Sequence, residues 1–207
     1  APAHLEGFGS IQAIIEEKAS VLEGIAPDGK IFIGGDVPEL AAHIRRKYKR
    51  PFTMVGESPY CDVRPDCMHS SGTAGWLRIE EQTIQVPLAG MANLKNVLIV
   101  WAICRDFKVA LSDFAQAVRT LRPGDMRLQI EHIGPVTVLN DCYNANPASM
   151  ENALDCLSQM AAQQHRRSVL IAGDMKELGP HSRSLHRHIG ATASRCGCLL
   201  YTSPSPR

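Results

Sequence analysis

The chain lacks the features of a membrane or nucleic-acid-binding protein. No apolar run approaches the ~18 residues needed to cross a bilayer, and the N-terminus has no basic segment followed by an apolar core. Lys+Arg number 22 and Asp+Glu 21, giving a formal charge of +1, so neither a nucleic-acid footprint nor a polybasic membrane patch is indicated. We expect a soluble, cytoplasmic protein with no nucleic-acid partner and no membrane insertion.

Cysteine and nucleotide motifs are also informative by absence. The seven cysteines are an odd number without a Cys-x-x-Cys pair, which argues against a zinc site or a disulfide framework and favours reduced thiols. No Gly-x-Gly-x-x-Gly follows an expected strand, which disfavours a nicotinamide-dependent oxidoreductase. A Gly-x-x-x-x-Gly-Lys-Ser/Thr phosphate loop is missing as well. Direct evidence for nucleotide binding must come from elsewhere in the chain.

The first part of the chain alternates between expected strands and helices. Such alternation predicts a parallel sheet with covering helices, interrupted by an antiparallel excursion over 62–86. The 207 residues, 44% hydrophobic, can bury a real core in one large or two small domains. The expected elements are a helix over 11–22 capped by Ser10, strands over 30–33 and 51–55, and helices over 38–48, 91–107 and 111–121.

A second domain is expected after the break at Arg122-Pro-Gly-Asp125. Its predicted order is β-β-α-β-α, with strands over 126–133, 135–140 and 168–172, and helices over 147–163 and from about His181. We therefore expect domains at 1–124 and 125–197. The ending 198–207 loses the helical pattern and closes in a Ser/Pro run, so it is expected to be a non-native tail outside the fold.

Polar residues gather between a strand and a helix at 140–150, Asn-Asp-Cys-Tyr-Asn-Ala-Asn-Pro-Ala-Ser-Met. Pro147 suits the first turn of a helix, and Asn146 or Ser149 could cap it. Loops beyond the carboxyl ends of strands bind ligands in open α/β sheets. An Asn-rich turn that bonds its own backbone is the alternative, and spacing alone does not choose between the two.

This stretch resembles the start of the C-terminal domain of the Mur ligase family, in particular of members that add D-alanyl-D-alanine to UDP-N-acetylmuramoyl-tripeptide. Gly173-Asp-Met-Lys-Glu-Leu-Gly179, followed by Ser184-Leu-His186, resembles a later block of the same members. The resemblance implies an α/β fold: a partial central ATP-binding domain followed by a truncated Rossmann-like C-terminal domain. ATP and Mg²⁺ are the implied cofactors.

The resemblance also assigns site residues. His4 and Lys18 match the catalytic positions that hold magnesium, Lys18 as a carbamate, which supplies the oxygen ligands that Mg²⁺ prefers. Without the family, both would be solvated surface residues. The positions matching nucleotide-binding residues are Asn93, Arg127, Asp141 and Tyr143, and those matching the amino-substrate edge are Asn144 and Asn146.

Within these matches the roles differ. Asn93 matches an adenine contact, Arg127 an arginine near the ATP phosphates and Asp141 an acid that bonds the ribose hydroxyls. Asn93 could equally cap its helix, and the family's usual histidine beside it is Ala92 here. Gly34 and Val37 also depart from the family pattern.

The loop Asp174, Lys176 and Glu177 follows an expected strand, where either a binding loop or a plain structured turn is possible. His181, His186 and His188 are expected on a solvent-exposed helix face.

The implied reaction is ATP-dependent amide bond formation through an acyl phosphate. Its substrates are UDP-N-acetylmuramoyl-tripeptide and D-alanyl-D-alanine. Because the phosphate loop and the domain for the UDP-sugar peptide are absent, the chain is predicted to be a fragment that is inactive alone. Another Mur-type or folylpolyglutamate-type ligase, or a non-catalytic nucleotide-binding module, is the alternative.

Overall fold

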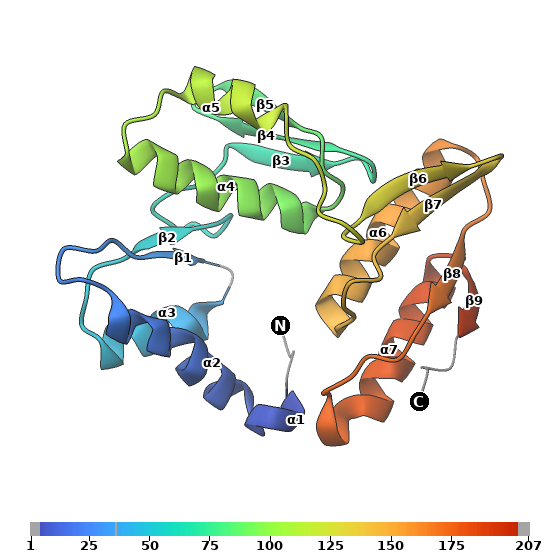
Figure 1. The fold of residues 1–207 in the computed structure, drawn as a ribbon, viewed down its shortest axis with the longest axis horizontal. Coiled ribbons are helices and arrows are strands. Elements are labelled where there is room, and N and C mark those ends of the chain that lie inside the picture. Colours follow the sequence, from blue (N-terminus) through green and yellow to red (C-terminus); the bar gives the residue numbers. More distant parts are fainter. Residues whose placement is uncertain (1–4, 36, 203–207) are drawn as a thin grey trace.

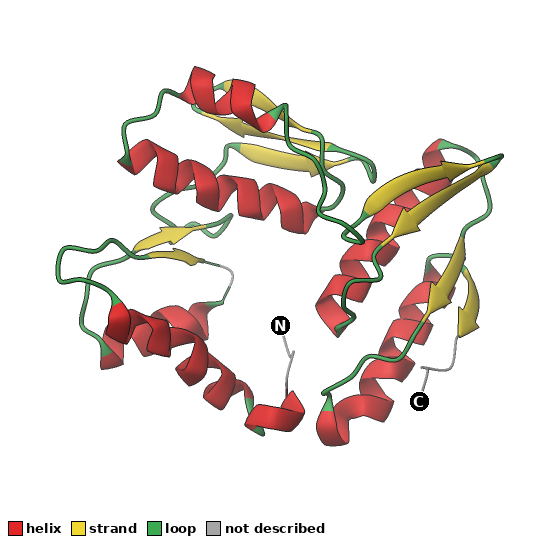
Figure 2. Cartoon of the chain, in the orientation of Figure 1, coloured by secondary structure: helices red, strands yellow, loops and turns green. Residues whose placement is uncertain are grey.

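The structure, a computed structural model, describes residues 5–35 and 37–202. These residues form two lobes of mixed helices and strands, which meet along the N-terminal end of α4 and the helix α6 (Figures 1 and 2). None of the helices in the described ranges is long and apolar enough to cross a membrane.

The first part of the N-terminal lobe is a small α/β unit. Strands β1 and β2 pair in parallel, with Phe32 opposite Thr53. Apolar residues of α2 and α3, including Ala19 and Ile44, pack with these strands in one buried cluster. The elements are α1 (Leu5–Phe8), α2 (Ile11–Ser20), the 3₁₀ turn η1 (Val21–Gly24), β1 (Phe32–Gly34), α3 (Pro38–Lys47) and β2 (Thr53–Val55).

The second part of the same lobe is an antiparallel sheet covered by two helices. Its strands follow in the order β3-β4-β5, and Leu77 and Ile84 face each other across the β4–β5 pair. Both are fully buried against Leu94 and Leu98 of α4, so this sheet and helix share the largest core. The elements are β3 (Cys67–Ser70), β4 (Gly75–Ile79), β5 (Gln82–Val86), α4 (Met91–Asp106) and α5 (Leu111–Val118).

The C-terminal lobe contains an antiparallel hairpin, a parallel strand pair and two long helices. Leu154 of α6 and Ile189 of α7 lie in one buried cluster with Leu178 of the loop after β8. The elements are β6 (Gln129–Ile133), β7 (Val136–Asn140), α6 (Pro147–Gln163), β8 (Val169–Ala172), the 3₁₀ turn η2 (Gly179–His181), α7 (Ser182–Arg195) and β9 (Leu199–Thr202). The expected boundary near Gly124 falls between α5 and β6.

The described elements follow the order expected from the sequence, apart from the short helix α1, which no pattern predicted, and one correction at the C-terminal end. Residues 199–202 were expected to lie in a tail outside the fold, but they form β9, which pairs in parallel with β8, Leu199 opposite Val169. Two physical reasons explain this strand. The local sequence Leu-Leu-Tyr-Thr suits a β-strand, and α7 brings the chain back so that residues 199–202 lie beside β8. Residues 203–207 lie outside the described part.

Close backbone approach joins the lobes. A Cβ at Gly72, which has φ +86°, would lie 2.9 Å from the carbonyl oxygen of Cys156 in α6, so only glycine fits this turn without displacement. Ala89 and Leu128 are buried together with Cys156 in a small cluster that spans both lobes. A second junction lies at α1, where the Glu6 N–H donates to the Glu177 carbonyl at 3.0 Å.

Candidate functional site

The hinge segment before β6 is bonded to the polar stretch after β7. The Leu128 N–H donates to Asp141 Oδ1 at 3.1 Å, and the Tyr143 N–H donates to the Met126 carbonyl at 3.1 Å. Met126 and Leu128 both have positive φ, 55° and 48°, a conformation that side chains other than glycine rarely adopt. The two hydrogen bonds hold this strained segment against Asp141 and Tyr143.

Asp141 is a half-buried carboxylate whose loss of hydration is only partly offset by its hydrogen bond and its neighbouring charge. Desolvation raises its pKa above the usual value, and this effect outweighs the lowering by the Leu128 N–H and by the nearby Arg127 guanidinium. The charged form is therefore held at a cost to folding. A carboxylate kept in such a place suits recognition of a ligand that donates hydrogen bonds.

Arg127 stacks over the ring of Tyr143. Its guanidinium carbon lies 3.8 Å from the ring centroid, a close cation–π contact. Both side chains are exposed, so the contact orients the guanidinium without removing it from solvent. A guanidinium oriented in this way can bind a phosphate by donating two hydrogen bonds to it, and the phosphate then replaces water.

Asn93 lies on the other lobe, near the same hinge. Its Nδ2 donates at 2.8 Å to the carbonyl of Ala89, which lies in the loop just before α4. Ala89 packs with Leu128, whose N–H binds Asp141. Asn93 and Asp141 thus stand on the two sides of one interlobe contact. The expected alternative, that Asn93 caps the helix, is wrong, because the N-cap of α4 is Gly90 without a side-chain cap bond and Asn93 Nδ2 donates to a carbonyl.

Asn152 of α6 is a hinge residue that the sequence did not single out. Its Oδ1 accepts from the Ala92 N–H at 3.4 Å, and a Cβ at Gly90 would lie 2.7 Å from its Nδ2. Nothing near Asn152 in the sequence signals this role, because its partners are about sixty residues earlier in the chain. It links the N-terminal end of α4 to the helix that follows the polar stretch.

Asn146 caps α6, as the sequence allowed. Its Oδ1 accepts from the Ser149 N–H at 3.0 Å, and Ser149 Oγ accepts from the Asn146 N–H at 3.0 Å, a complete capping box. The neighbouring Asn144 is exposed, and its Oδ1 accepts from the Ala145 N–H at 2.8 Å. The turn interpretation is therefore correct for Asn146 Oδ1, while a substrate role for either amide stays a prediction.

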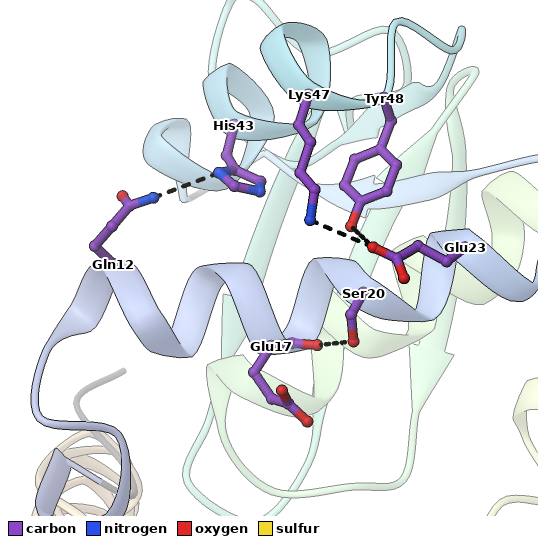
Figure 3. Close-up of polar contacts among 7 residues, drawn as sticks. All are labelled: Gln12, Glu17, Ser20, Glu23, His43, Lys47 and Tyr48. Carbon is purple, nitrogen blue, oxygen red and sulfur yellow. Dashed lines mark hydrogen bonds and ion pairs between the residues drawn. The ribbon is translucent and has the colours of Figure 1, made fainter.

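Lys18 is exposed on α2, apart from the hinge residues in the sequence and on another element. Two polar contacts tie α2 and the following turn η1 to α3 (Figure 3): Gln12 Nε2 of α2 lies 3.4 Å from His43 Nδ1, and Glu23 of η1 accepts from Lys47 Nζ at 3.3 Å. These contacts fix the helix that presents Lys18. His4 lies outside the described residues.

The loop after β8 lines a cavity of about 860 Å³ together with α1 and the start of α7. Asp174, Lys176 and Glu177 are exposed there, whereas Met175 and Leu178 are buried. None of the residues expected to bind nucleotide lines this cavity. His181 and His188 are exposed, as expected, but His186 is half-buried and hydrogen-bonded, which corrects the exposed-face interpretation for that residue.

Comparison with known proteins agrees with this architecture. Two family models match: the Mur ligase middle domain over residues 1–104 and the Mur ligase glutamate ligase domain over residues 126–207. The middle-domain match alone covers half of the 207 residues. The chain belongs to the Mur ligase family.

Two curated relatives carry the same ligase name. The chain is 28% identical over 195 residues to the UDP-N-acetylmuramoyl-tripeptide–D-alanyl-D-alanine ligase of Bacillus subtilis, covering 93% of this chain and 41% of that protein. It is 27% identical over 211 residues to the ligase of the same name from Escherichia coli, covering 95% and 44%. The chain thus spans less than half the length of these relatives.

Solved structures share the fold. A crystal structure of MurF from Acinetobacter baumannii superposes with a TM-score of 0.79 at 23% identity, covering 98% of this chain and 48% of that one. MurF from Thermotoga maritima in complex with ADP superposes with a TM-score of 0.78 at 18% identity, covering 98% and 51%. The mixed α/β fold of both lobes is therefore that of a Mur ligase.

Proposed function

We propose that this chain is the hinge-side part of an ATP-dependent ligase that adds D-alanyl-D-alanine to UDP-N-acetylmuramoyl-tripeptide in peptidoglycan precursor synthesis in the cytoplasm. The observation that carries the proposal is the geometry of the hinge, where the Leu128 N–H donates to Asp141 Oδ1 at 3.1 Å and the Arg127 guanidinium stacks on Tyr143. The names of relatives that match 93% or more of this chain support the substrate assignment.

The reaction divides into two steps. The terminal carboxylate of the UDP-linked peptide attacks the γ-phosphorus of ATP, which gives an acyl phosphate and ADP. The amine of D-alanyl-D-alanine then attacks the acyl carbon, and inorganic phosphate leaves as the amide forms. Positioning of three substrates is the protein's main task, because little of this chemistry needs a covalent enzyme group.

The hinge residues suit the nucleotide part of this task. Asp141 would accept hydrogen bonds from the ribose hydroxyls, and Asn93 would offer an amide to adenine, with both a donor and an acceptor. Arg127, oriented by Tyr143, would meet the phosphates. Asn144 and Asn146 would line the edge where the amine enters, Asn146 through its Nδ2, since its Oδ1 caps α6.

Magnesium enters the proposal only through His4 and Lys18. Within the described ranges no group of three His, Cys, Asp or Glu side chains could hold a metal ion. Lys18 is exposed and could react with carbon dioxide, and its carbamate would supply oxygen ligands. Lys18 alone does not make a magnesium site among the described residues, and the two steps of the reaction above therefore involve only the substrates.

The activity test uses both this chain and the whole protein that contains it. We expect no ATP-dependent amide formation from the chain alone, because it has no phosphate loop. The whole protein is expected to release phosphate only when the UDP-linked tripeptide and D-alanyl-D-alanine are both present. Equal or better turnover with a single amino acid would favour another Mur-type or a folylpolyglutamate-type ligase.

Replacement of Asp141 by Ala in the whole protein tests the hinge. We expect a rise in KM for ATP of at least about tenfold, since a charged hydrogen bond acceptor is lost. Asp113→Ala, which removes an exposed carboxylate of α5, is the matched control for charge removal and should leave KM for ATP unchanged. An unchanged KM in Asp141→Ala would contradict the nucleotide role.

A further inference from the structure

The imidazole of His186 joins two segments of the C-terminal lobe. Its Nε2 lies 3.0 Å from the Met175 N–H, which donates to it, and its Nδ1 lies 2.8 Å from the Ser182 carbonyl oxygen. Met175 belongs to the loop after β8 and Ser182 is the first residue of α7. Figure 1 shows this loop running along α7 to the start of the helix.

The two backbone contacts select one tautomer of the ring, and Ser182 Oγ, 3.3 Å from Nδ1, can act as a further acceptor. An amide N–H can only donate, so Nε2 must carry a lone pair, and a carbonyl oxygen can only accept, so Nδ1 must carry the hydrogen. The two backbone contacts therefore fit the Nδ1–H tautomer, with the lone pair on Nε2. A proton on Nε2 would place two donors against each other and break the contact with Met175.

The loop needs this support because its backbone is strained. Glu177 has φ 63°, in the left-handed region that favours glycine. Met175 and Leu178, 4% and 1% exposed, anchor the loop in the core of the lobe. Asp174, on the outer side of the Met175 anchor, is exposed on the cavity. The bond from Met175 to the ring is thus a polar contact of the first half of the loop, while the carbonyl of Glu177 in the second half accepts from the Glu6 N–H.

We propose that His186 is a positioning residue, a proton-sensitive latch that holds the loop Gly173–Gly179 in its binding conformation. The neutral ring keeps the Met175 amide in place, and protonation of Nε2 releases the first half of the loop. The proposal rests on the proposed function only in its consequence: with the latch open, Asp174 and Lys176 no longer present a fixed surface to a peptide or amino substrate.

Charged groups surround the ring from several elements. Glu6 of α1 and Arg183 of α7 line the same cavity as His186, together with the loop residues Asp174, Lys176 and Glu177. On its other side the ring meets an apolar hollow that α6 lines with Met150 and β9 with Leu200. Groups of both signs therefore line the cavity side of the ring, and the Met175 N–H is hydrogen-bonded to its Nε2.

Exchange of the Met175 amide hydrogen, measured by NMR on the chain without nucleotide, reads the latch directly. Rates are corrected for the pH dependence of chemical exchange. Between about pH 8 and about pH 5.5, we expect protection of this amide to fall by roughly fivefold or more, the factor for loss of one hydrogen bond. The Leu154 amide in α6 should keep its protection, which shows that the lobe stays folded.

Two variants separate the latch from a merely structural role. His186→Gln places an amide oxygen near the position of Nε2, so protection of the Met175 amide should persist without a pH step. His186→Asn is too short to reach Met175, and protection should be low at both pH values. His188→Gln, exposed on the same helix and paired with Glu151, is the control and should keep the pH step of the unchanged chain.

A pH step that persists in His186→Gln would overturn the proposal, because another group would then be titrating. Full protection in His186→Asn, or no step in the unchanged chain, would also overturn it. If His186→Asn does not fold, the comparison between His186→Gln and the unchanged chain decides alone. Since no nucleotide is present, failure of the latch leaves the proposed role of the hinge untouched.

Discussion

Replacing Asn146 by Ala separates the structural from the functional use of this side chain. The change removes Oδ1, the acceptor for the Ser149 N–H at 3.0 Å, while the backbone N–H of residue 146 can still donate to Ser149 Oγ. One of the two bonds of the capping box is lost, so the expected destabilisation is about 1 kcal/mol, within the range of roughly 0.5–2 for N-cap removal. The effect should appear in the C-terminal lobe, where α6 packs through Leu154.

Urea unfolding followed by circular dichroism measures this difference. Asn146→Ser keeps a hydroxyl acceptor at the cap and should retain most of the stability. Asn144→Ala, in the same stretch but with an exposed side chain, should cost less than about 0.5 kcal/mol. The reasoning fails if Asn146→Ala is as stable as the unchanged chain, or if Asn146→Ser is destabilised equally. In the whole protein, Asn146→Ser should still impair use of D-alanyl-D-alanine, because the Nδ2 donor is gone.

Three further outcomes follow from burial. The pKa of Asp141 is raised in the folded chain, so its stabilising contribution is fully present below the unfolded pKa and is lost as pH rises through the folded pKa. Asp141→Asn, which keeps an acceptor for Leu128, should therefore slightly raise the free energy of unfolding at neutral pH and give no gain at about pH 3 in urea titrations. Burial raises the pKa of the Cys156 thiol to about 11. In the folded chain a thiol reagent should therefore modify Cys156 at least about 100-fold more slowly than the exposed Cys142. Comparable modification rates of the two thiols, measured by mass spectrometry, would contradict this. Leu154→Ala, at a side chain 1% exposed, should cost about 2–5 kcal/mol in urea unfolding, and a loss below 1 kcal/mol would show that the lobe is loosely packed.

Elements with local signals were predictable from the sequence. Helix α6 begins at Pro147 and ends at Gln163, as expected, because its apolar spacing, its proline and its Asn146 cap all lie within the segment. Strand β9 was missed, because its only local signal, Leu-Leu-Tyr-Thr, precedes a Ser/Pro run and its pairing with β8 depends on the path of α7. Close approach of Gly72 to Cys156 was likewise invisible, since the two residues are far apart in the chain.

The candidate site divides in the same way. Asp141 and Tyr143 stand together because they share one short motif, but the stacking of Arg127 on Tyr143 and the bond from Leu128 to Asp141 are tertiary contacts that no spacing reveals. His186 is the clearest example of a contact that the sequence pattern does not predict. A helical pattern places it near an exposed face, and only the fold of the loop after β8 shows that its ring is half-buried and bonded.

Binding of ADP to the chain, followed by amide chemical shifts at millimolar nucleotide, tests the central claim most directly. The account predicts shifts at Asn93, Leu128 and Asp141 on the two sides of the hinge, and their loss in Asp141→Ala. It is contradicted if ADP leaves these amides unmoved, or if the shifts gather instead around Asp174 and Lys176 at the cavity after β8.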